Sequence, residues 1–341
     1  MIISMLISIC IPSYNRPYEL KRLLESIDCS SNDIEIVICE DNSPLRNQIR
    51  DVVKIYSKTS SYRINYIENI NNLGFDANVR NLIDLAKGDF VLFMGDDDRF
   101  YPNALDQYIN FVRDNSHAGY ILRSYYSEHP NGVLELFKYL PKSKTLEPTI
   151  SNCSFLYKRT VSIAGITFKR KKAVKLSTSR FDGTLLYQLY ILLEISYKLP
   201  SVYCDIPFTI VAQTFRLDKP YFGTSKSETK FTVGKVTPEN SIAFMKGFFE
   251  ISEYFDVIHN EKLSDLIRLD LSKYSYPILS IQRKNGFIKF IKYSINLGRE
   301  TKINNSFYYY IYTFALLFFG EKICDKVIIY IKNVLGYTPN L

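Results

Sequence analysis

Three adjacent aspartates, Asp96, Asp97 and Asp98, follow an apolar stretch and are the side chains best suited to chemistry. Neighbouring carboxylates repel one another, so placing them in one site costs free energy unless a cation or hydrogen-bond donors compensate. Mg²⁺ and Mn²⁺ prefer such oxygen ligands and are typically held by one or two carboxylates together with substrate phosphates. The run therefore indicates a divalent metal site. A solvated acidic turn before a helix, with Asp98 or Asn103 as its cap, is the simpler interpretation of the same residues.

Four polar clusters lie at or beside the ends of apolar runs that precede the aspartates. They read Pro-Ser-Tyr-Asn-Arg at residues 12–16, Glu-Asp-Asn-Ser at 40–43, Asn-Leu-Gly at 72–74 and Ala-Lys-Gly-Asp at 86–89. Together they supply an aromatic ring, cations, amides and carboxylates, which are the groups that a polar, phosphorylated ligand needs. As a set, they favour the metal-site interpretation over the solvated turn.

The elements that position these clusters alternate in type along the first 125 residues. Helical periodicity is predicted from Pro17, over residues 49–57 and 75–86, and from Pro102. Buried strands are predicted at residues 6–11, 34–39, 64–67, 90–94 and 120–124. This alternation predicts an α/β fold with βαβ units and a mostly parallel sheet. Ligands bind such sheets beyond the carboxyl ends of the strands, where the polar clusters fall.

The same clusters, in the same order, resemble the nucleotide-sugar-binding half of family 2 glycosyltransferases, which have the Rossmann-like GT-A fold. The resemblance covers roughly residues 5–110 and fades beyond about residue 235. It implies that residues 1–235 form a GT-A catalytic domain and that residues 236–341 form a helical C-terminal region. The segment Phe-Asp-Gly-Thr-Leu-Leu-Tyr-Gln, from residue 181, is similar to the O-antigen branch that includes abequosyltransferases.

The resemblance also implies a role for each matching position. A divalent cofactor, Mn²⁺ or Mg²⁺, would bridge the diphosphate of the donor. The donor-binding residues would be Pro12, Tyr14 and Arg16 on the base and ribose side, Glu40 and Asp41 at the nucleobase or ribose, Asn78 and Arg80 in the nucleotide pocket, and Asp96 at the ribose, with Asp97 and Asp98 at the metal.

Inverting transfer requires a general base that takes the proton from the acceptor hydroxyl. In the resembled family this base starts a helix well downstream of the metal signature, and Asp182 occupies the matching kind of place here. Phe181 stands where the family has a second acidic residue. Asp182 as an N-cap of a helix over residues 182–198 is the alternative, and Asp205 is the reserve candidate for the base.

Basic residues concentrate at two other places. The cluster Lys169, Arg170, Lys171, Lys172 and Lys175 contacts either phosphates or, as favoured here, water. Residues 281–341 hold nine Lys/Arg against three acidic residues, a charge of +6 out of the net +8 of the whole chain. This basic tail includes an aromatic run at residues 308–319. It favours a helix lying on an anionic membrane surface over a core helix, and the sequence contains no nucleic-acid motif.

These observations predict a hexosyltransferase-type enzyme that transfers a sugar from a nucleotide-sugar donor to a saccharide acceptor. The expected acceptor is carried on a polyprenyl diphosphate, in bacterial surface polysaccharide or O-antigen synthesis. The expected location is cytoplasmic and peripheral, on the inner face of the inner membrane, since no stretch reaches the roughly 18 apolar residues of a spanning helix. A sugar nucleotidyltransferase and a non-catalytic polysaccharide- or membrane-binding module are the two alternatives.

Overall fold

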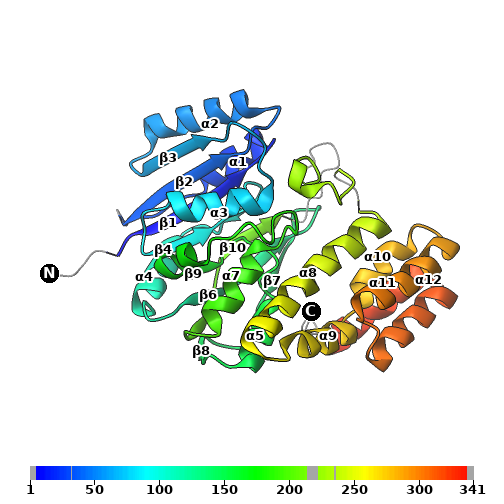
Figure 1. The fold of residues 1–341 in the computed structure, drawn as a ribbon. Coiled ribbons are helices and arrows are strands. Elements are labelled where there is room, and N and C mark those ends of the chain that lie inside the picture. Colours follow the sequence, from blue (N-terminus) through cyan, green and yellow to red (C-terminus); the bar gives the residue numbers. More distant parts are fainter. Residues whose placement is uncertain (1–4, 32, 213–221, 234–235, 336–341) are drawn as a thin grey trace. The chain divides into compact units, whose positions relative to one another are not determined.

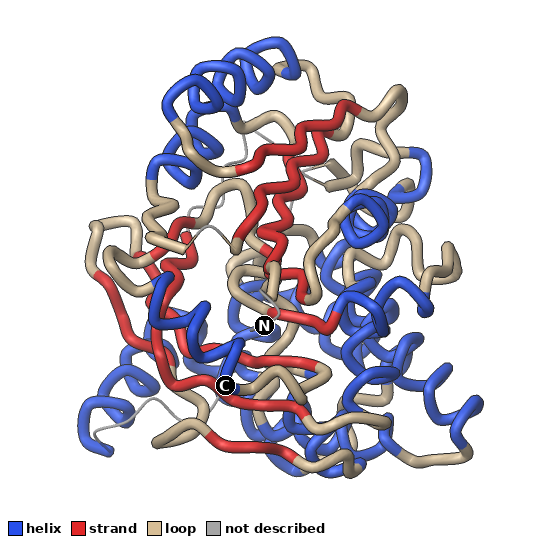
Figure 2. Tube along the Cα trace, turned by 90° about the vertical axis from the view of Figure 1, so that its left-hand side faces the viewer, coloured by secondary structure: helices blue, strands red, loops and turns tan. Residues whose placement is uncertain are grey.

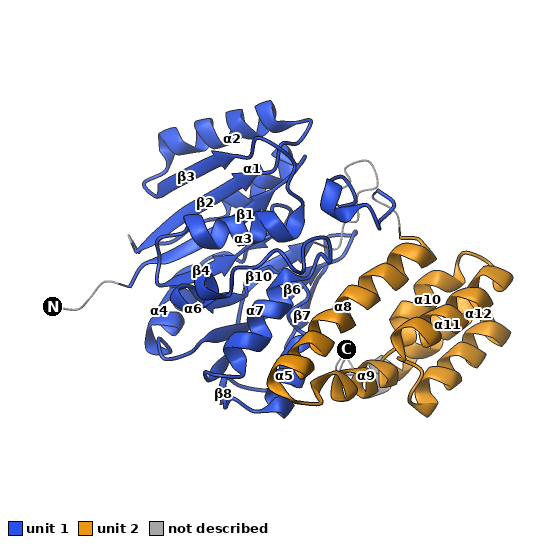
Figure 3. Cartoon of the chain, viewed as in Figure 1, with its two compact units in different colours: residues 1–234 blue, residues 235–341 orange. Residues whose placement is uncertain are grey.

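The computed structural model describes residues 5–31, 33–212, 222–233 and 236–335. The chain forms two compact units, residues 1–234 (unit 1) and residues 235–341 (unit 2), drawn in blue and orange in Figure 3.

The N-terminal half of unit 1 has the predicted alternation of strands and helices. Its elements are β1 (Ile7–Ser13), α1 (Pro17–Glu25), β2 (Ile34–Glu40), α2 (Arg46–Thr59), β3 (Arg63–Glu68), α3 (Phe75–Leu85), β4 (Phe90–Phe93), β5 (Arg99–Phe100), α4 (Leu105–Asp114) and β6 (Tyr120–Glu128). The α4 helix begins three residues after Pro102, which was predicted to start it. Asn103 has a positive φ of 59°, so the chain cannot be helical before Ala104.

The second half of unit 1 is less regular, as its sequence indicates. It comprises β7 (Leu134–Phe137), β8 (Lys144–Leu146), α5 (Ile150–Tyr157), β9 (Thr167–Lys169), α6 (Arg170–Ala173), a 3₁₀ turn (Val174–Leu176), α7 (Tyr187–Ser196), β10 (Ser201–Ala212) and a second 3₁₀ turn (Lys226–Glu228). β6 and β7 form an antiparallel hairpin. β9 and β10 were not predicted.

The strands of unit 1, red in Figure 2, belong to one mixed sheet. Its order is β3-β2-β1-β4-β9-β6-β10-β5, with β7 added beside β6 and β8 beside β10. Neighbours among β1 to β4 pair in parallel, as do β6 and β10, whereas β9 runs antiparallel between β4 and β6. The prediction of a mostly parallel sheet is therefore confirmed for the half that carries the polar clusters.

Alternation along the central strands buries both faces of the sheet. Ile7, Ile9 and Ile11 of β1 pack in one core cluster with apolar residues of α1, α2 and α4. Cys10, which points to the opposite face, is also fully buried, and on that face α3 packs against β1 and β2 and also against α7 (Figure 1). Because helices cover both faces, only the ends of the strands remain open for polar side chains.

Unit 2 is helical, as predicted. It contains α8 (Pro238–His259), α9 (Leu263–Lys273), α10 (Tyr276–Arg283), α11 (Phe287–Thr301) and α12 (Phe307–Leu335). Non-helical backbone at Gly320 (φ 71°) divides α12 into two straight segments. No helix in the described part of the chain is both long and apolar enough to cross a membrane.

Candidate active site

The acidic run follows β4 directly, and β4 lies beside β1 in the sheet. Because parallel strands end at the same edge, the loop after β1 reaches the aspartates. The Tyr14 backbone N–H donates to Asp96 Oδ2 at 3.0 Å, and Arg16 Nη1 donates to Asp96 Oδ1 at 2.8 Å. Pro12, the second-last residue of β1, is in the same strand end. The structure thus brings together two clusters that lie about 80 residues apart in the sequence.

Asp97 is the most exposed carboxylate of the run. Its side chain is 27% exposed, while the side chain of Asp96 is 7% exposed. Arg16 Nη1 lies 2.9 Å from Asp97 Oδ2, and Arg22 Nη2 donates to the Asp97 carbonyl oxygen at 3.2 Å. Two cations therefore hold Asp97 at the open side of the site, where a ligand can reach it.

Asp98 is buried. Its Oδ1 accepts a hydrogen bond at 2.9 Å from the backbone N–H of Ala212, the last residue of β10. Neither Asp98 nor Asn103 caps α4, because the N-cap is Ala104 and no side chain bonds the first turn. The simpler interpretation of the run as a capped turn is therefore wrong.

Burial is the largest influence on the pKa values of Asp96 and Asp98. It raises the pKa of Asp96 to about 6, against the opposing charge of Arg16. Burial and then the charge of Asp97 raise the pKa of Asp98 well above its usual value, although the Ala212 hydrogen bond opposes them. The arrangement therefore contains more negative charge than the surrounding protein compensates, which a cation would relieve.

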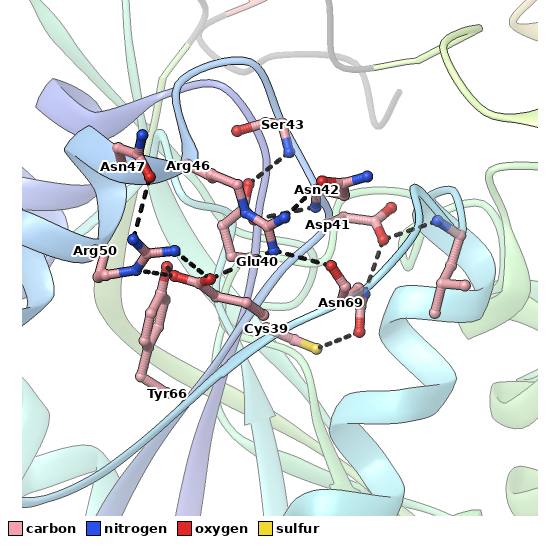
Figure 4. Close-up of polar contacts among 12 residues, drawn as sticks. Cys39, Glu40, Asp41, Asn42, Ser43, Arg46, Asn47, Arg50, Tyr66 and Asn69 are labelled. Carbon is pink, nitrogen blue, oxygen red and sulfur yellow. Dashed lines mark hydrogen bonds and ion pairs between the residues drawn. The ribbon is translucent and has the colours of Figure 1, made fainter.

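Asp41, at the end of β2, organises the loop before α3. It is buried, and its carboxylate accepts from Asn69 Nδ2 at 2.8 Å (Figure 4). It also accepts from the backbone N–H groups of Leu73 and Gly74, both at 2.9 Å. Burial raises the pKa of Asp41, and these three hydrogen bonds lower it. Asn78 joins the same network, since Asn69 Nδ2 donates to its Oδ1 and its Nδ2 donates to the Cys39 carbonyl.

Glu40 is fully buried in its own turn. Its carboxylate accepts from the backbone N–H groups of Asn42 and Ser43 at 3.0 and 2.8 Å, and Arg46 Nε lies 3.5 Å away (Figure 4). These contacts fix the chain between β2 and α2. Glu40 therefore shapes the turn beside Asp41 and presents no carboxylate oxygen at the surface.

Asp182 forms a bidentate ion pair with Arg80 of α3. Arg80 Nη1 lies 2.5 Å from Oδ1, Nη2 lies 2.9 Å from Oδ2, and Nη1 also donates to the Thr178 carbonyl. Both side chains are about one-fifth exposed. The structure thus joins two residues that were predicted for different roles and that lie 102 positions apart.

The helix predicted from Asp182 begins at Tyr187, so the prediction of its start is wrong, as is the N-cap role for Asp182. Positive φ angles at Gly183 and Leu185 keep this segment non-helical, and Leu186 is the N-cap residue. Asp76 of α3 holds the turn by accepting from the backbone N–H groups of Leu185 and Tyr187. Burial raises the pKa of Asp76 to about 7.

Two of the other predicted candidates lie away from the acidic run. Lys169 pairs with Phe90, the first residue of β4, whereas the acidic run follows the last residue of β4. The basic cluster therefore begins at the opposite end of this strand. Asp205 lies seven residues before Ala212 on β10, roughly 20 Å along an extended strand, and accepts from Ser143 Oγ. Neither placement suits contact with a ligand at the acidic run.

Three polar residues of this region were not singled out in the sequence: Asn69, Asp76 and Glu228. Glu228 is buried, and its carboxylate accepts from the backbone N–H groups of Phe75 at 2.8 Å and Gly223 at 2.7 Å. It thereby bonds the first turn of α3, which has no side-chain cap of its own. The Asn-rich loop was visible as a pattern, but contacts over more than 150 positions, such as that of Glu228 with Phe75, leave no local signal.

Comparison with known proteins gives a family for this architecture. Residues 8–171 match Glycosyl transferase family 2. Abequosyltransferase RfbV of Salmonella typhimurium is 33% identical over 102 residues, which are 30% of this chain and 31% of RfbV. GalNAc(5)-diNAcBac-PP-undecaprenol beta-1,3-glucosyltransferase of Campylobacter jejuni is 28% identical over 230 residues, 67% of this chain and 71% of that protein. The chain thus spans about a third of the first relative and more than two thirds of the second.

A solved structure supports the fold assignment. S. aureus TarS, residues 1–349, in complex with UDP-GlcNAc, matches 94% of this chain and 92% of its own, with a TM-score of 0.59 and 16% identity. At this identity the likeness concerns the fold alone. The family match thus identifies residues 8–171 as similar to glycosyltransferase family 2, and the TarS likeness shows the GT-A fold.

Proposed function

We propose that the chain transfers a sugar from a nucleotide-sugar donor to a hydroxyl of a saccharide acceptor, with inversion at the anomeric carbon. The observation that carries this proposal is the meeting of Tyr14 and Arg16 with Asp96, beside the partly exposed Asp97. A nucleotide bound beyond the ends of β1, β2 and β4 would lie between the Asp41 network and the acidic run. The TarS complex with UDP-GlcNAc supports a nucleotide sugar as the donor class.

Asp97 and Asp98 are the residues that would hold Mn²⁺ or Mg²⁺. The donor set fits such an ion, because both are carboxylates and burial of Asp98 is compensated by few hydrogen bonds. No group of three or more His, Cys, Asp or Glu side chains suited to a metal occurs among the described residues, but Mg²⁺ is often held by two carboxylates and substrate phosphates. The ion would neutralise charge that develops on the leaving diphosphate.

Residues of this chain would position the metal ligand and the nucleotide pocket and would remove the proton from the acceptor. Arg16 and Arg22 hold Asp97 in place, and the Asp41 network fixes the loop that borders the nucleotide pocket. Asp182 would take the proton from the acceptor hydroxyl. Its ion pair with Arg80 fixes the direction of the carboxylate and leaves the second lone pair of each oxygen for a substrate hydroxyl.

Donor binding is testable without an acceptor. A thermal-shift panel of UDP, GDP, CDP and dTDP, each with Mn²⁺ or Mg²⁺, should show stabilisation by one nucleotide that requires the metal. At a ligand concentration 100 times the Kd the gain is about 2.7 kcal/mol, or a rise of roughly 5–10 °C in the melting temperature. Equal melting temperatures throughout the panel would contradict a nucleotide-sugar enzyme.

The proposed acceptor is carried on a polyprenyl diphosphate at the inner face of the inner membrane, in surface polysaccharide or O-antigen synthesis. The undecaprenol-linked acceptor in the name of the Campylobacter relative supports this class. So does α12, which exposes two apolar stripes at helical spacing. The stripes are Phe307, Ile311, Phe314 and Phe318 before the kink, and Ile323, Val327 and Tyr330 after it. The exposed Lys322 and Lys326 flank the second stripe, so the surface suits anionic lipid.

Replacing Phe314 and Phe318 together with Glu should reduce binding to vesicles that contain phosphatidylglycerol. Each phenyl ring loses about 1.5–3 kcal/mol of apolar burial, so cosedimentation with vesicles is expected to fall by at least roughly tenfold. Ile55→Glu is the matched control, because Ile55 is an exposed apolar residue on α2 of unit 1. Equal vesicle binding by all three proteins would exclude the α12 stripes as the membrane contact.

A further inference from the structure

Arg123, the fourth residue of β6, lies level with the start of the acidic run. In the sheet Leu92 of β4 pairs with Thr167 of β9, and Thr167 pairs with Ile121 of β6. Continuing this register two positions beyond the paired residues brings Arg123 opposite Gly165, which precedes β9, and level with Met94, which follows β4. The register therefore places Arg123 across one strand from the residue that comes just before Gly95 and the three aspartates.

Among the described residues, Arg123 has the largest side chain that is fully buried. Its Nη2 donates one long hydrogen bond, 3.5 Å, to the hydroxyl of the exposed Ser162. Nε and Nη1 have no hydrogen-bond partner among the described residues, and the guanidinium lies 4.6 Å from the centre of the Tyr125 ring. A guanidinium remains charged in proteins, so burying it with so few partners costs free energy that packing does not return.

Gly165 provides the space for this side chain. It has a φ of +81°, and a Cβ added there would lie 3.1 Å from Arg123 Cγ and 2.9 Å from Thr209 Cγ2. The Gly165 N–H donates to the Phe93 carbonyl at 2.7 Å, so the same residue ties the loop after α5 to the end of β4. The arginine stem thus passes a gap left by glycine beside the strand that carries the acidic run.

We propose that Arg123 binds a phosphate oxyanion of a substrate through its Nε–H and Nη1–H groups. This inference rests on the proposed function, in which the donor carries a diphosphate and the acceptor a polyprenyl diphosphate. A guanidinium offers a planar fork that matches two phosphate oxygens, and a phosphate would supply the hydrogen-bond acceptors that Nε and Nη1 lack among the described residues. Arg123 would then complete, from the β6 side, the electrostatic site that Arg16 and the metal ligands form from β1 and β4.

Arg123→Met tests this role against a structural one. Methionine keeps much of the volume and removes a buried, poorly paired charge, so the melting temperature should stay equal or rise. Arg113→Met is the control, because the Arg113 guanidinium has protein partners: Nη2 donates to Asp33 and Ser31, and Nη1 donates to Asn110. This control should lower the melting temperature slightly and leave ligand binding unchanged.

Two titrations identify the source of the phosphate. If Arg123 binds the donor, Arg123→Met weakens binding of the preferred nucleoside diphosphate by roughly 10–100-fold but not binding of the nucleoside. If it binds the acceptor, nucleoside diphosphate affinity is kept, and inorganic pyrophosphate loses its ability to inhibit transfer. Arg123→Lys keeps the charge without the fork, so it should bind with intermediate affinity, and it serves as the test variant if the methionine variant does not fold.

The proposal is overturned if Arg123→Met, whatever its melting temperature, keeps both the nucleoside diphosphate affinity and the pyrophosphate inhibition. That result differs from a failure of the proposed function itself. In the latter case the wild-type protein would bind no nucleoside diphosphate with either metal, and the inference about Arg123 would fall with it.

Discussion

Replacing Asp97 with Asn is expected to lower the rate of sugar transfer by a factor on the order of 10³, which corresponds to about 4 kcal/mol. Asn keeps the shape of the side chain and one oxygen, but it removes the negative charge that a divalent cation requires. The leaving diphosphate then loses the charge neutralisation that makes its departure favourable. The measurement is the initial rate of transfer at saturating donor and metal, compared with the wild type.

The same substitution should leave the fold intact or stabilise it. The charge of Asp97 raises the pKa values of both Asp96 and Asp98, so it repels both neighbours in the folded state. Removing that charge relieves the repulsion, while the loss of the 2.9 Å contact with Arg16 offsets part of the gain. We therefore expect a change in the free energy of unfolding within about 1 kcal/mol, measured by urea titration.

Asp33→Asn is the matched control for Asp97→Asn. Asp33 also forms an ion pair with an arginine, at 2.8 Å from Arg113, and its side chain is 34% exposed, close to the 27% of Asp97. Asp33 lies just before the first residue of β2, whereas the acidic run lies beyond the carboxyl ends of the parallel strands. This variant should keep its full transfer rate. Retention of more than a tenth of the wild-type rate by Asp97→Asn would refute the metal role assigned to Asp97.

The half of the sheet that carries the acidic run could be predicted because its strands are buried on both faces. Ile7–Ser13 and Ile34–Glu40 are continuous apolar runs that end in polar residues, and a parallel sheet aligns those ends. β10 was not predicted, since Asp205 and Pro207 interrupt its pattern and the pairing with β6 is irregular on both sides of Pro207. β9 has only three residues, too few to show a period.

The sequence predicted which residues belong to the site better than it predicted how these residues contact one another. The sequence indicated a ligand role for Asp41, yet not that Asn69 and the Leu73 and Gly74 amides would fix its carboxylate. The pairing of Arg80 with Asp182 depends on how α3 packs against the segment before α7, which no spacing in the sequence specifies. The sequence contains no indication of a role for Arg123, because it shows neither that the side chain is buried nor that Nε and Nη1 have no hydrogen-bond partner among the described residues.

Replacing Asp182 with Asn is expected to lower kcat by roughly 10²–10⁴-fold, the usual contribution of a general base. The amide keeps one acceptor oxygen for Arg80 but cannot take a proton. Because the substitution also removes the counter-charge of a mostly buried guanidinium, the free energy of unfolding should fall by about 1–3 kcal/mol. Transfer rates are therefore compared at a temperature and urea concentration where both proteins are fully folded.

The separate effects on kcat and on donor affinity distinguish a base from a merely structural ion pair. Arg80→Met breaks the same pair but keeps the carboxylate, so it should retain much more of kcat than Asp182→Asn does. Asp182→Asn should also keep the metal-dependent affinity for the nucleoside diphosphate that Asp97→Asn loses, because the base acts on the acceptor. If Asp182→Asn lost donor affinity and Arg80→Met lowered kcat to the same extent, Asp182 would belong to the nucleotide pocket with Arg80, and the base would be another carboxylate.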